Sequence, residues 1–315
     1  MKDLRIVFMG TPDFAVGILD KLIEANAPVV GVITAPDKPA GRGRRLHESA
    51  VKKYAVAKGL PVLQPTNLKA ESFLDELRAL KANLQIVVAF RMLPKVVWAM
   101  PEHGTFNLHA SLLPEYRGAA PINWAVINGE SESGVTTFFI DEKIDTGAII
   151  TSEKITLEER ETAGSLHDKL MELGGEVVVH TTQLIADGKA HPQPQPKDLE
   201  FKEAPKLNTL NTQIDWRQPG ARLDAMIRGL SPYPTAWTVL INQGTEQKVK
   251  IQEAIFQAAE HGQFTGQITA GKKELAVAVS DGYLYIKVMQ LPGKRKMDIV
   301  SLLNGYNFEK EAKFA

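Results

Sequence analysis

Three polar residues of this 315-residue chain have the chemistry of an acyl-transfer site. Asn107 and His109 lie two positions apart in a short segment with the pattern of a strand, and Asp145 opens the turn Asp-Thr-Gly. Side chains alternate between the two faces of a strand, so Asn107 and His109 point the same way. An amide can donate to a developing oxyanion, while an imidazole and a carboxylate can accept a proton from an attacking amine and return it to a leaving nitrogen. We take these three residues as the candidate catalytic set.

Other interpretations of the same residues stay open at this point. A Ser-His-Asp hydrolase would need an activated serine, and Ser111 does not stand in a G-x-S-x-G motif. A metal site at His103, Asn107 and His109 has little support, because the chain has no H-E-x-x-H motif and Asn is a poor ligand for transition metals. With no Cys in the chain, thiolate chemistry is excluded. The Asn/His pair could also be ordinary polar residues at the end of a strand.

Two glycine-containing segments could bind phosphates. The segment at 10–14, Gly-Thr-Pro-Asp-Phe, is not a G-x-G-x-x-G fingerprint, so it reads as a tight turn before a helix. The segment at 36–46 lacks the Gly-Lys-Ser/Thr ending of a P-loop, but it is long and cationic, which suits the backbone of a nucleic acid. A solvated surface loop explains its charges equally well. Its basic residues are Lys38, Arg42, Arg44 and Arg45.

The elements that must position these residues alternate between strands and helices. This alternation predicts an α/β domain with a parallel sheet, in which ligands bind at the carboxyl ends of the strands. The segments with strand patterns are 4–8, 29–33, 62–63, 84–90, 105–110, 135–140 and 148–151, and those with helical patterns are 14–25, 49–58, 70–80, 94–100 and 162–185.

The last third of the chain has a different pattern. Three prolines alternate with other residues at 192–196, which predicts an extended linker, and we place the domain boundary at 190–207. A helix is expected at 219–230. Five short strands then follow within about 60 residues, which favours a small barrel such as an OB fold. Their ranges are 237–241, 249–255, 266–268, 275–279 and 284–289.

Composition and charge restrict the class of protein. The hydrophobic fraction is 44%, yet no apolar run approaches 18 residues, so we expect no transmembrane helix. The charged start and the early Pro12 argue against a signal peptide, and we expect a cytoplasmic protein. Basic and acidic groups balance at 37 each, but residues 206–315 hold 14 Lys and Arg against 10 Asp and Glu. A basic patch there could hold a phosphate backbone locally.

Five motifs together resemble the folate-dependent formyltransferases and, within that group, the methionyl-tRNA formyltransferase family. The resemblance extends through Asp-Trp at 215–216 and Pro-Tyr-Pro at 232–234, so it covers essentially the whole chain. The motifs are Gly-Thr-Pro-Asp-Phe at 10–14, Ala-Gly-Arg-Gly at 40–43, Asn-Leu-His-Ala-Ser-Leu-Leu-Pro at 107–114, Tyr-Arg-Gly-Ala-Ala-Pro-Ile at 116–122 and Asp-Thr-Gly at 145–147.

The resemblance implies a Rossmann-like formyltransferase domain at 1–189, a linker at 190–207 and an OB-like, tRNA-binding β-barrel at 208–315. It implies 10-formyltetrahydrofolate as the formyl donor, methionyl initiator tRNA as the acceptor and no metal, in a protein that we expect to be monomeric. By position, the catalytic residues would be Asn107, His109 and Asp145, the folate contacts Ser111, Leu112, Leu113 and Pro114, and the tRNA contacts Lys38, Arg42, Arg44 and Arg45.

The sequence departs from the family pattern at two places. Ala110 replaces a common glycine, and the segment at 88–94 is one residue shorter than usual, with Arg91 at a position where glycine is common. Two rival functions also remain. One is a formyltransferase acting on a small amine such as a nucleotide-linked amino sugar, for which the basic loop would be unnecessary. The other is an RNA-binding protein without catalysis, which would have no need of a folate site.

Overall fold

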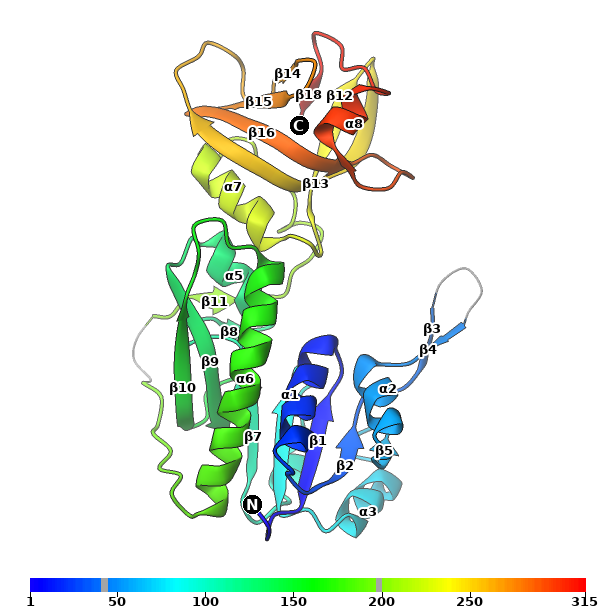
Figure 1. The fold of residues 1–315 in the computed structure, drawn as a ribbon, viewed down its shortest axis with the longest axis vertical. Coiled ribbons are helices and arrows are strands. Elements are labelled where there is room, and N and C mark those ends of the chain that lie inside the picture. Colours follow the sequence, from blue (N-terminus) through cyan, green and yellow to red (C-terminus); the bar gives the residue numbers. More distant parts are fainter. Residues whose placement is uncertain (41–44, 197–199) are drawn as a thin grey trace. The chain divides into compact units, whose positions relative to one another are not determined.

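The computed structural model describes residues 1–40, 45–196 and 200–315, which form two compact units (Figure 1). The first unit comprises Met1–Gly118, Ser133–Ile155 and His167–Glu203, and the second comprises Ala119–Glu132, Thr156–Leu166 and Ala204–Ala315. Two segments from the earlier part of the chain therefore pack with its last third. The division into 1–189, 190–207 and 208–315 follows the chain instead of the packing, and it stays a prediction.

The first unit is built on a seven-stranded sheet of the expected α/β type. Strands β1, β2, β5, β6 and β7 are parallel, and β9 joins β7 antiparallel. The order is β10-β9-β7-β6-β1-β2-β5, which places β7 beside β6. The Rossmann-like prediction is thereby confirmed. The strands are β1 (Ile6–Gly10), β2 (Val29–Ile33), β5 (Val62–Leu63), β6 (Leu84–Val88), β7 (Thr105–His109), β9 (Glu132–Phe139) and β10 (Ile149–Thr156).

Helices lie on both faces of this sheet, as Figure 1 shows. One face carries a core that includes Met9, Val87 and Phe73 of α3. On the other face, α6 comes so close to β7 that a Cβ added at Gly174 would lie 2.8 Å from the Leu108 side chain. The helices are α1 (Asp13–Glu24), α2 (Ala50–Ala57), α3 (Glu71–Ala79), α4 (Lys95–Trp98) and α6 (Ala163–Ala186).

Several short elements were not predicted from the sequence. Strands β3 (Lys38–Ala40) and β4 (Arg45–His47) pair antiparallel within the segment expected to be a loop. Strand β8 (Arg117–Gly118) pairs with β11 (Glu203–Ala204), and α5 (Pro121–Ile127) follows β8. The expected loop at 36–46 is therefore wrong in part. Strands of two or three residues are too short to show an alternating pattern.

The second unit contains an antiparallel sheet that curves into a nearly closed barrel. Its strand order is β14-β15-β16-β13-β12-β18, with β17 paired to β16. A bridge between Gln267 and Lys313 connects the two ends of this order. The barrel-like prediction is confirmed. The elements are α7 (Gly220–Gly229), β12 (Ala236–Asn242), β13 (Thr245–Ala258), β14 (Ile268–Ala270), β15 (Leu275–Val279), β16 (Gly282–Gln290), β17 (Met297–Asp298), α8 (Ile299–Leu303) and β18 (Lys313–Phe314).

Within the second unit, α5 and the segment at 156–166 are bound to α7. Ile127 is 3% exposed and belongs to the same core as the barrel. The Arg222 guanidinium donates to the Ile127 carbonyl at 2.6 Å, and Arg160 donates to both carboxylate oxygens of Asp224 at 2.7 and 2.8 Å. These contacts explain why the unit is discontinuous in sequence. In the part of the chain that the structure describes, no helix is long and apolar enough to cross a bilayer.

Candidate active site

Strand β7 places Asn107 and His109 on one face of the sheet, at its carboxyl end. Leu108 packs toward α6 on the opposite face, so the two polar side chains point away from α6, as predicted. Asn107 is half-buried and lies between Val87 of β6 and Phe138 of β9. The structure gives its amide no hydrogen-bond partner among the described residues. This amide is therefore available as a donor to a bound group.

The two ring nitrogens of His109 have different partners. Nε2 lies 2.8 Å from the carbonyl oxygen of Tyr116, and because a carbonyl only accepts, Nε2 carries a proton and donates it there. Nδ1 lies 3.8 Å from the Oδ2 atom of Asp145, which is beyond direct hydrogen-bond distance. His109 is only 6% exposed, so both environments are well defined. In the neutral imidazole Nδ1 is the free acceptor, and in the imidazolium it faces a carboxylate.

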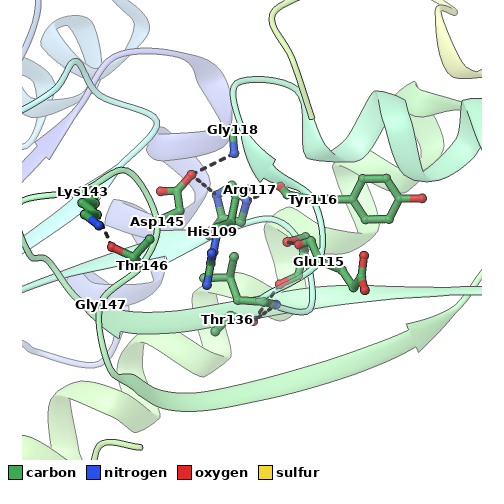
Figure 2. A network of polar contacts seen from close by, with 12 residues as sticks. His109, Glu115, Tyr116, Arg117, Gly118, Thr136, Lys143, Asp145, Thr146 and Gly147 are labelled. Atoms are coloured by element: carbon green, nitrogen blue, oxygen red, sulfur yellow. Dashed lines mark hydrogen bonds and ion pairs between the residues drawn. The ribbon is translucent and has the colours of Figure 1, made fainter. Parts of the chain in front are cut away.

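Asp145 is held by the turn that joins β9 to β10 (Figure 2). Its carboxylate accepts a hydrogen bond of 2.9 Å from the backbone N–H of Gly118, and Figure 2 shows it directed toward Gly118 and His109. Its backbone has a φ of 55°, a left-handed conformation that Asp tolerates better than most residues. Two positions later, a Cβ on Gly147 would lie 1.7 Å from the Phe139 carbonyl oxygen. The shape of the turn thus requires glycine at 147 and suits aspartate at 145.

All four predicted folate contacts lie in the tight turn after β7. The Ser111 hydroxyl donates to the Glu115 carbonyl at 2.6 Å, and the Ser111 carbonyl accepts from Thr136 Oγ1 at 2.7 Å. The Leu113 N–H donates to the same Thr136 oxygen at 3.1 Å, and a cis peptide bond joins Leu113 to Pro114. Ser111 and Leu113 are buried. The turn places the Tyr116 carbonyl against His109, and the folate role of residues 111–114 stays a prediction.

Gln195, which binds the Asp145 turn, and Arg117, which binds Gln195, were not among the predicted site residues. Gln195 accepts from Arg117 and donates to the carbonyls of Asp145 and Gly147, at 3.0 and 2.8 Å. Arg117 belongs to a quoted motif, but nothing in its position indicated this partner. Gln195 lies in the proline-rich segment interpreted as a linker, and the sequence offers no signal for its burial. The structure therefore brings five residues together here: His109, Asp145, Gly118, Arg117 and Gln195.

The predicted tRNA contacts are placed only in part. Lys38 lies on β3 and is exposed. Arg45 is the first residue of β4. Arg42 and Arg44 lie outside the described residues. At the base of this hairpin, Lys52 donates to Asp37 and this contact holds the pKa of the Asp37 carboxyl below its ordinary value. Gln64 adds a hydrogen bond of 2.8 Å to the same carboxylate.

Arg91, at the departure from the family pattern, uses its guanidinium to join two loops at the carboxyl edge of the sheet. It donates to the Thr66 carbonyl at 3.1 Å and to the Pro65 carbonyl, and it lies 5.6 Å from the Phe90 ring centroid. Ala89, two positions earlier, has a positive φ of 48°. The segment at 88–94 is thus fixed by contacts of its own. Within the described residues, no three His, Asp or Glu side chains are grouped as metal ligands.

Relatives of this chain share its whole length. It is 57% identical over 313 residues to the "Methionyl-tRNA formyltransferase" of Flavobacterium johnsoniae, with 99% of each chain covered. The protein of the same name from Parabacteroides distasonis is 55% identical over 312 residues, which cover 97% of this chain and 96% of the relative.

Solved structures show the same fold at lower identity. HypX from Aquifex aeolicus superposes with a TM-score of 0.65 at 19% identity over 96% of this chain, which spans about half of HypX, 49% of its length. WlaRD, a sugar 3N-formyl transferase, superposes with a TM-score of 0.65 at 21% identity, covering 93% of this chain and 99% of WlaRD.

Family matches account for both parts of the sequence. The family described as Formyl transferase matches residues 4–182, and the one described as Formyl transferase, C-terminal domain, matches residues 206–307. The resemblance that the motifs indicated is confirmed. With the polar site at the carboxyl end of β7 and full-length relatives above 50% identity, this chain belongs to the formyl transferase family.

Proposed function

We propose that this protein transfers the formyl group of 10-formyltetrahydrofolate to the α-amino group of methionyl initiator tRNA. The product, N-formylmethionyl-tRNA, would serve translation initiation. Full-length relatives that carry the name methionyl-tRNA formyltransferase support this activity. The single observation that carries the chemistry is the position of His109 Nδ1, which lies 3.8 Å from the Asp145 carboxylate and forms no hydrogen bond with a described residue.

The proposed reaction moves one proton and exchanges one bond. The methionyl amine attacks the formyl carbon, a new C–N bond forms, and the bond between that carbon and the folate nitrogen breaks. His109 Nδ1 accepts the amine proton, directly or through water, and returns it to the departing nitrogen. Asp145 stabilises the imidazolium between these two events. The Tyr116 carbonyl keeps the other ring nitrogen protonated and the ring in place.

Asn107 would stabilise the charge that develops on the formyl oxygen. Its amide lies on the same strand face as His109, two residues earlier, and has no competing partner in the described part of the protein. A donor of this kind contributes roughly 2.7–4 kcal/mol to lowering a barrier.

The donor and acceptor would reach this centre from different parts of the chain. Residues Ser111, Leu112, Leu113 and Pro114 are the proposed folate contacts, and Lys38, Arg42, Arg44 and Arg45 the proposed tRNA contacts. We further propose a catalytic domain at 1–189, a linker at 190–207 and a tRNA-binding barrel at 208–315. On the barrel, Lys248 lies 3.6 Å from the Trp237 ring centroid, which gives a cation beside an aromatic surface. A monomeric, cytoplasmic enzyme that needs no metal completes the proposal.

A single-turnover assay tests the proposal with three acceptors side by side. The enzyme is given 10-formyltetrahydrofolate and methionyl initiator tRNA, methionyl elongator tRNA or an amino-sugar nucleotide. Fast transfer to the initiator tRNA alone is expected. Transfer to the amino-sugar nucleotide would contradict tRNA as the acceptor and support 10-formyltetrahydrofolate as the donor. Absence of transfer to all three, with folate binding intact, would contradict the proposed reaction.

A further inference from the structure

Gln195 is a buried amide whose hydrogen-bonding capacity is fully used. It is 6% exposed. Its Oε1 atom accepts from Arg117 Nε at 3.2 Å and from Arg117 Nη2 at 2.6 Å. Its Nε2 atom donates to the Asp145 carbonyl at 3.0 Å and to the Gly147 carbonyl at 2.8 Å. A carboxamide has two N–H donors and one oxygen with two lone pairs, so no further partner is needed.

These contacts form a closed ring around Asp145. Gln195 holds the Asp145 backbone carbonyl on one side and the Arg117 guanidinium on the other. Arg117 is followed directly by Gly118, whose N–H donates to the Asp145 carboxylate at 2.9 Å. The Gln195 amide therefore holds the Asp145 backbone directly and the Asp145 side chain indirectly, through Arg117 and the adjacent Gly118. Displacing Gln195 would release both at once.

The ring is itself anchored to neighbouring structure. Gln193 and Ile149 exchange two backbone hydrogen bonds of 2.8 Å, which fixes the segment carrying Gln195 beside β10. The Arg117 guanidinium lies 5.2 Å from the Phe201 ring centroid. The left-handed φ of Asp145 and the close approach of Gly147 to Phe139 leave the turn little freedom to adjust. The amide is thus a rigid support for the turn.

We propose that Gln195 is a positioning residue for formyl transfer, because it fixes the Asp145 carboxylate relative to His109 Nδ1. This inference rests on the proposed function, in which Asp145 stabilises the imidazolium. The distance of 3.8 Å between the two groups is set by the turn and not by a direct bond between them. A displacement of about 1 Å at such a centre can lower a rate by as much as ~10²-fold. Gln195 acts on the rate through Asp145 and does not touch a substrate.

Two substitutions of Gln195 test this role in the full-length protein. Gln195→Glu keeps an acceptor for Arg117 but places oxygen against the Asp145 and Gly147 carbonyls, and Gln195→Met removes all four hydrogen bonds at similar volume. For both, we expect the single-turnover rate to fall by about 10- to 100-fold. The dissociation constant for 10-formyltetrahydrofolate should stay within about twofold of wild type, because Gln195 is not a folate contact.

The matched control is Gln193→Glu, which changes the same residue type two positions earlier. Gln193 is exposed, and its side chain donates a hydrogen bond of 3.2 Å to the His191 carbonyl and to no other described residue. Its variant should react at the wild-type rate. In an Asp145→Asn background, Gln195→Glu should add less than a twofold further loss, because both changes act on one group.

Each outcome decides a different point. Wild-type rates in both Gln195 variants, with Asp145→Asn impaired, would overturn the inference and leave the proposed function standing. If the Gln195 variants lose folate affinity and thermal stability together with the transfer rate, the inference is also overturned, because such losses indicate a purely structural residue. A fully active Asp145→Asn enzyme would contradict the proposed mechanism itself.

Discussion

At the scale of single residues, different groups fix the tautomer of His109 and face the charge on its ring, two roles that a single carboxylate often combines. The Tyr116 carbonyl selects the tautomer of His109, and in the proposed mechanism Asp145 responds to the charge on Nδ1. Gly118 in turn supplies the N–H that keeps the Asp145 carboxylate directed at the ring. The half-buried amide of Asn107 has no structural task in the described part of the protein. Catalysis and stability should therefore respond differently to substitution of these residues.

Asn107→Ala should lower the single-turnover rate by ~10²–10³-fold, because it removes one oxyanion donor. Its thermal midpoint should change by no more than about 2 °C, since no hydrogen bond to the amide is lost. Rapid-quench kinetics and calorimetry on the same preparation check both parts. A variant that reacts at the wild-type rate would remove Asn107 from the catalytic set. A variant that fails to fold would show instead that the amide has a structural role.

At the scale of elements, the parts that could be predicted are those with a long pattern. β7 is predictable because polar and apolar residues alternate along Thr105–His109, and with it the shared face of Asn107 and His109. The Asp-Thr-Gly turn is predictable because residue types that tolerate special backbone geometry come together. Gln195 was not predictable, because a proline-rich stretch reads as a linker whether it is exposed or packed. The hairpin of β3 and β4 has too few residues for a pattern.

Ser49 caps the N-terminus of α2. The Ser49 hydroxyl accepts from the Lys52 N–H at 3.0 Å and shares a hydrogen bond of 2.7 Å with the buried Thr34 hydroxyl. Ser49→Ala should lower the free energy of unfolding of the unit by about 1 kcal/mol or more, because a cap and a partner are both lost. Urea denaturation measures this. Ser49→Thr, which keeps the hydroxyl, should retain most of the stability, and an equal loss in both variants would contradict the capping role.

Gly147 lies in the turn that carries Asp145, where it packs against Phe139. Gly147→Ala would place a methyl group 1.7 Å from the Phe139 carbonyl oxygen, so the turn must move. We expect a loss of roughly 1–3 kcal/mol in unfolding free energy, together with a reduced transfer rate. Gly262→Ala is the control, because a Cβ there meets no atom within 4 Å and should change neither quantity. A Gly147→Ala enzyme with wild-type rate and stability would show that the turn has more room than its geometry indicates.

At the scale of the whole molecule, each compact unit has a core of its own, yet the chain passes between the units more than once. The barrel core includes Ile127 of α5, more than 80 residues before the first strand of that barrel. The Asp224 carboxylate, 8% exposed, accepts from both Arg160 and Arg228. A carboxylate at this depth is stabilised only while both partners are present. Sequence order alone could not reveal this, because contacts over such separations leave no local pattern.

This arrangement makes a prediction for a chain cut at the expected domain boundary. A fragment of residues 1–207 retains Ile127 and Arg160 but loses the barrel core and Asp224, so it should expose apolar surface and self-associate. The dye ANS binds exposed apolar surface, so its fluorescence should be several-fold higher with the fragment than with the full chain. Burial of a large apolar side chain such as Ile127 is worth roughly 1.5–3 kcal/mol, which favours binding of dye or self-association over exposure to water. Placing Ile127→Lys in the same fragment should lower the dye signal, since a cation suits the end of α5. A monomeric 1–207 fragment that unfolds cooperatively and binds no dye would show that the segment at 119–132 packs stably without the barrel, and would favour a division of the protein at 190–207.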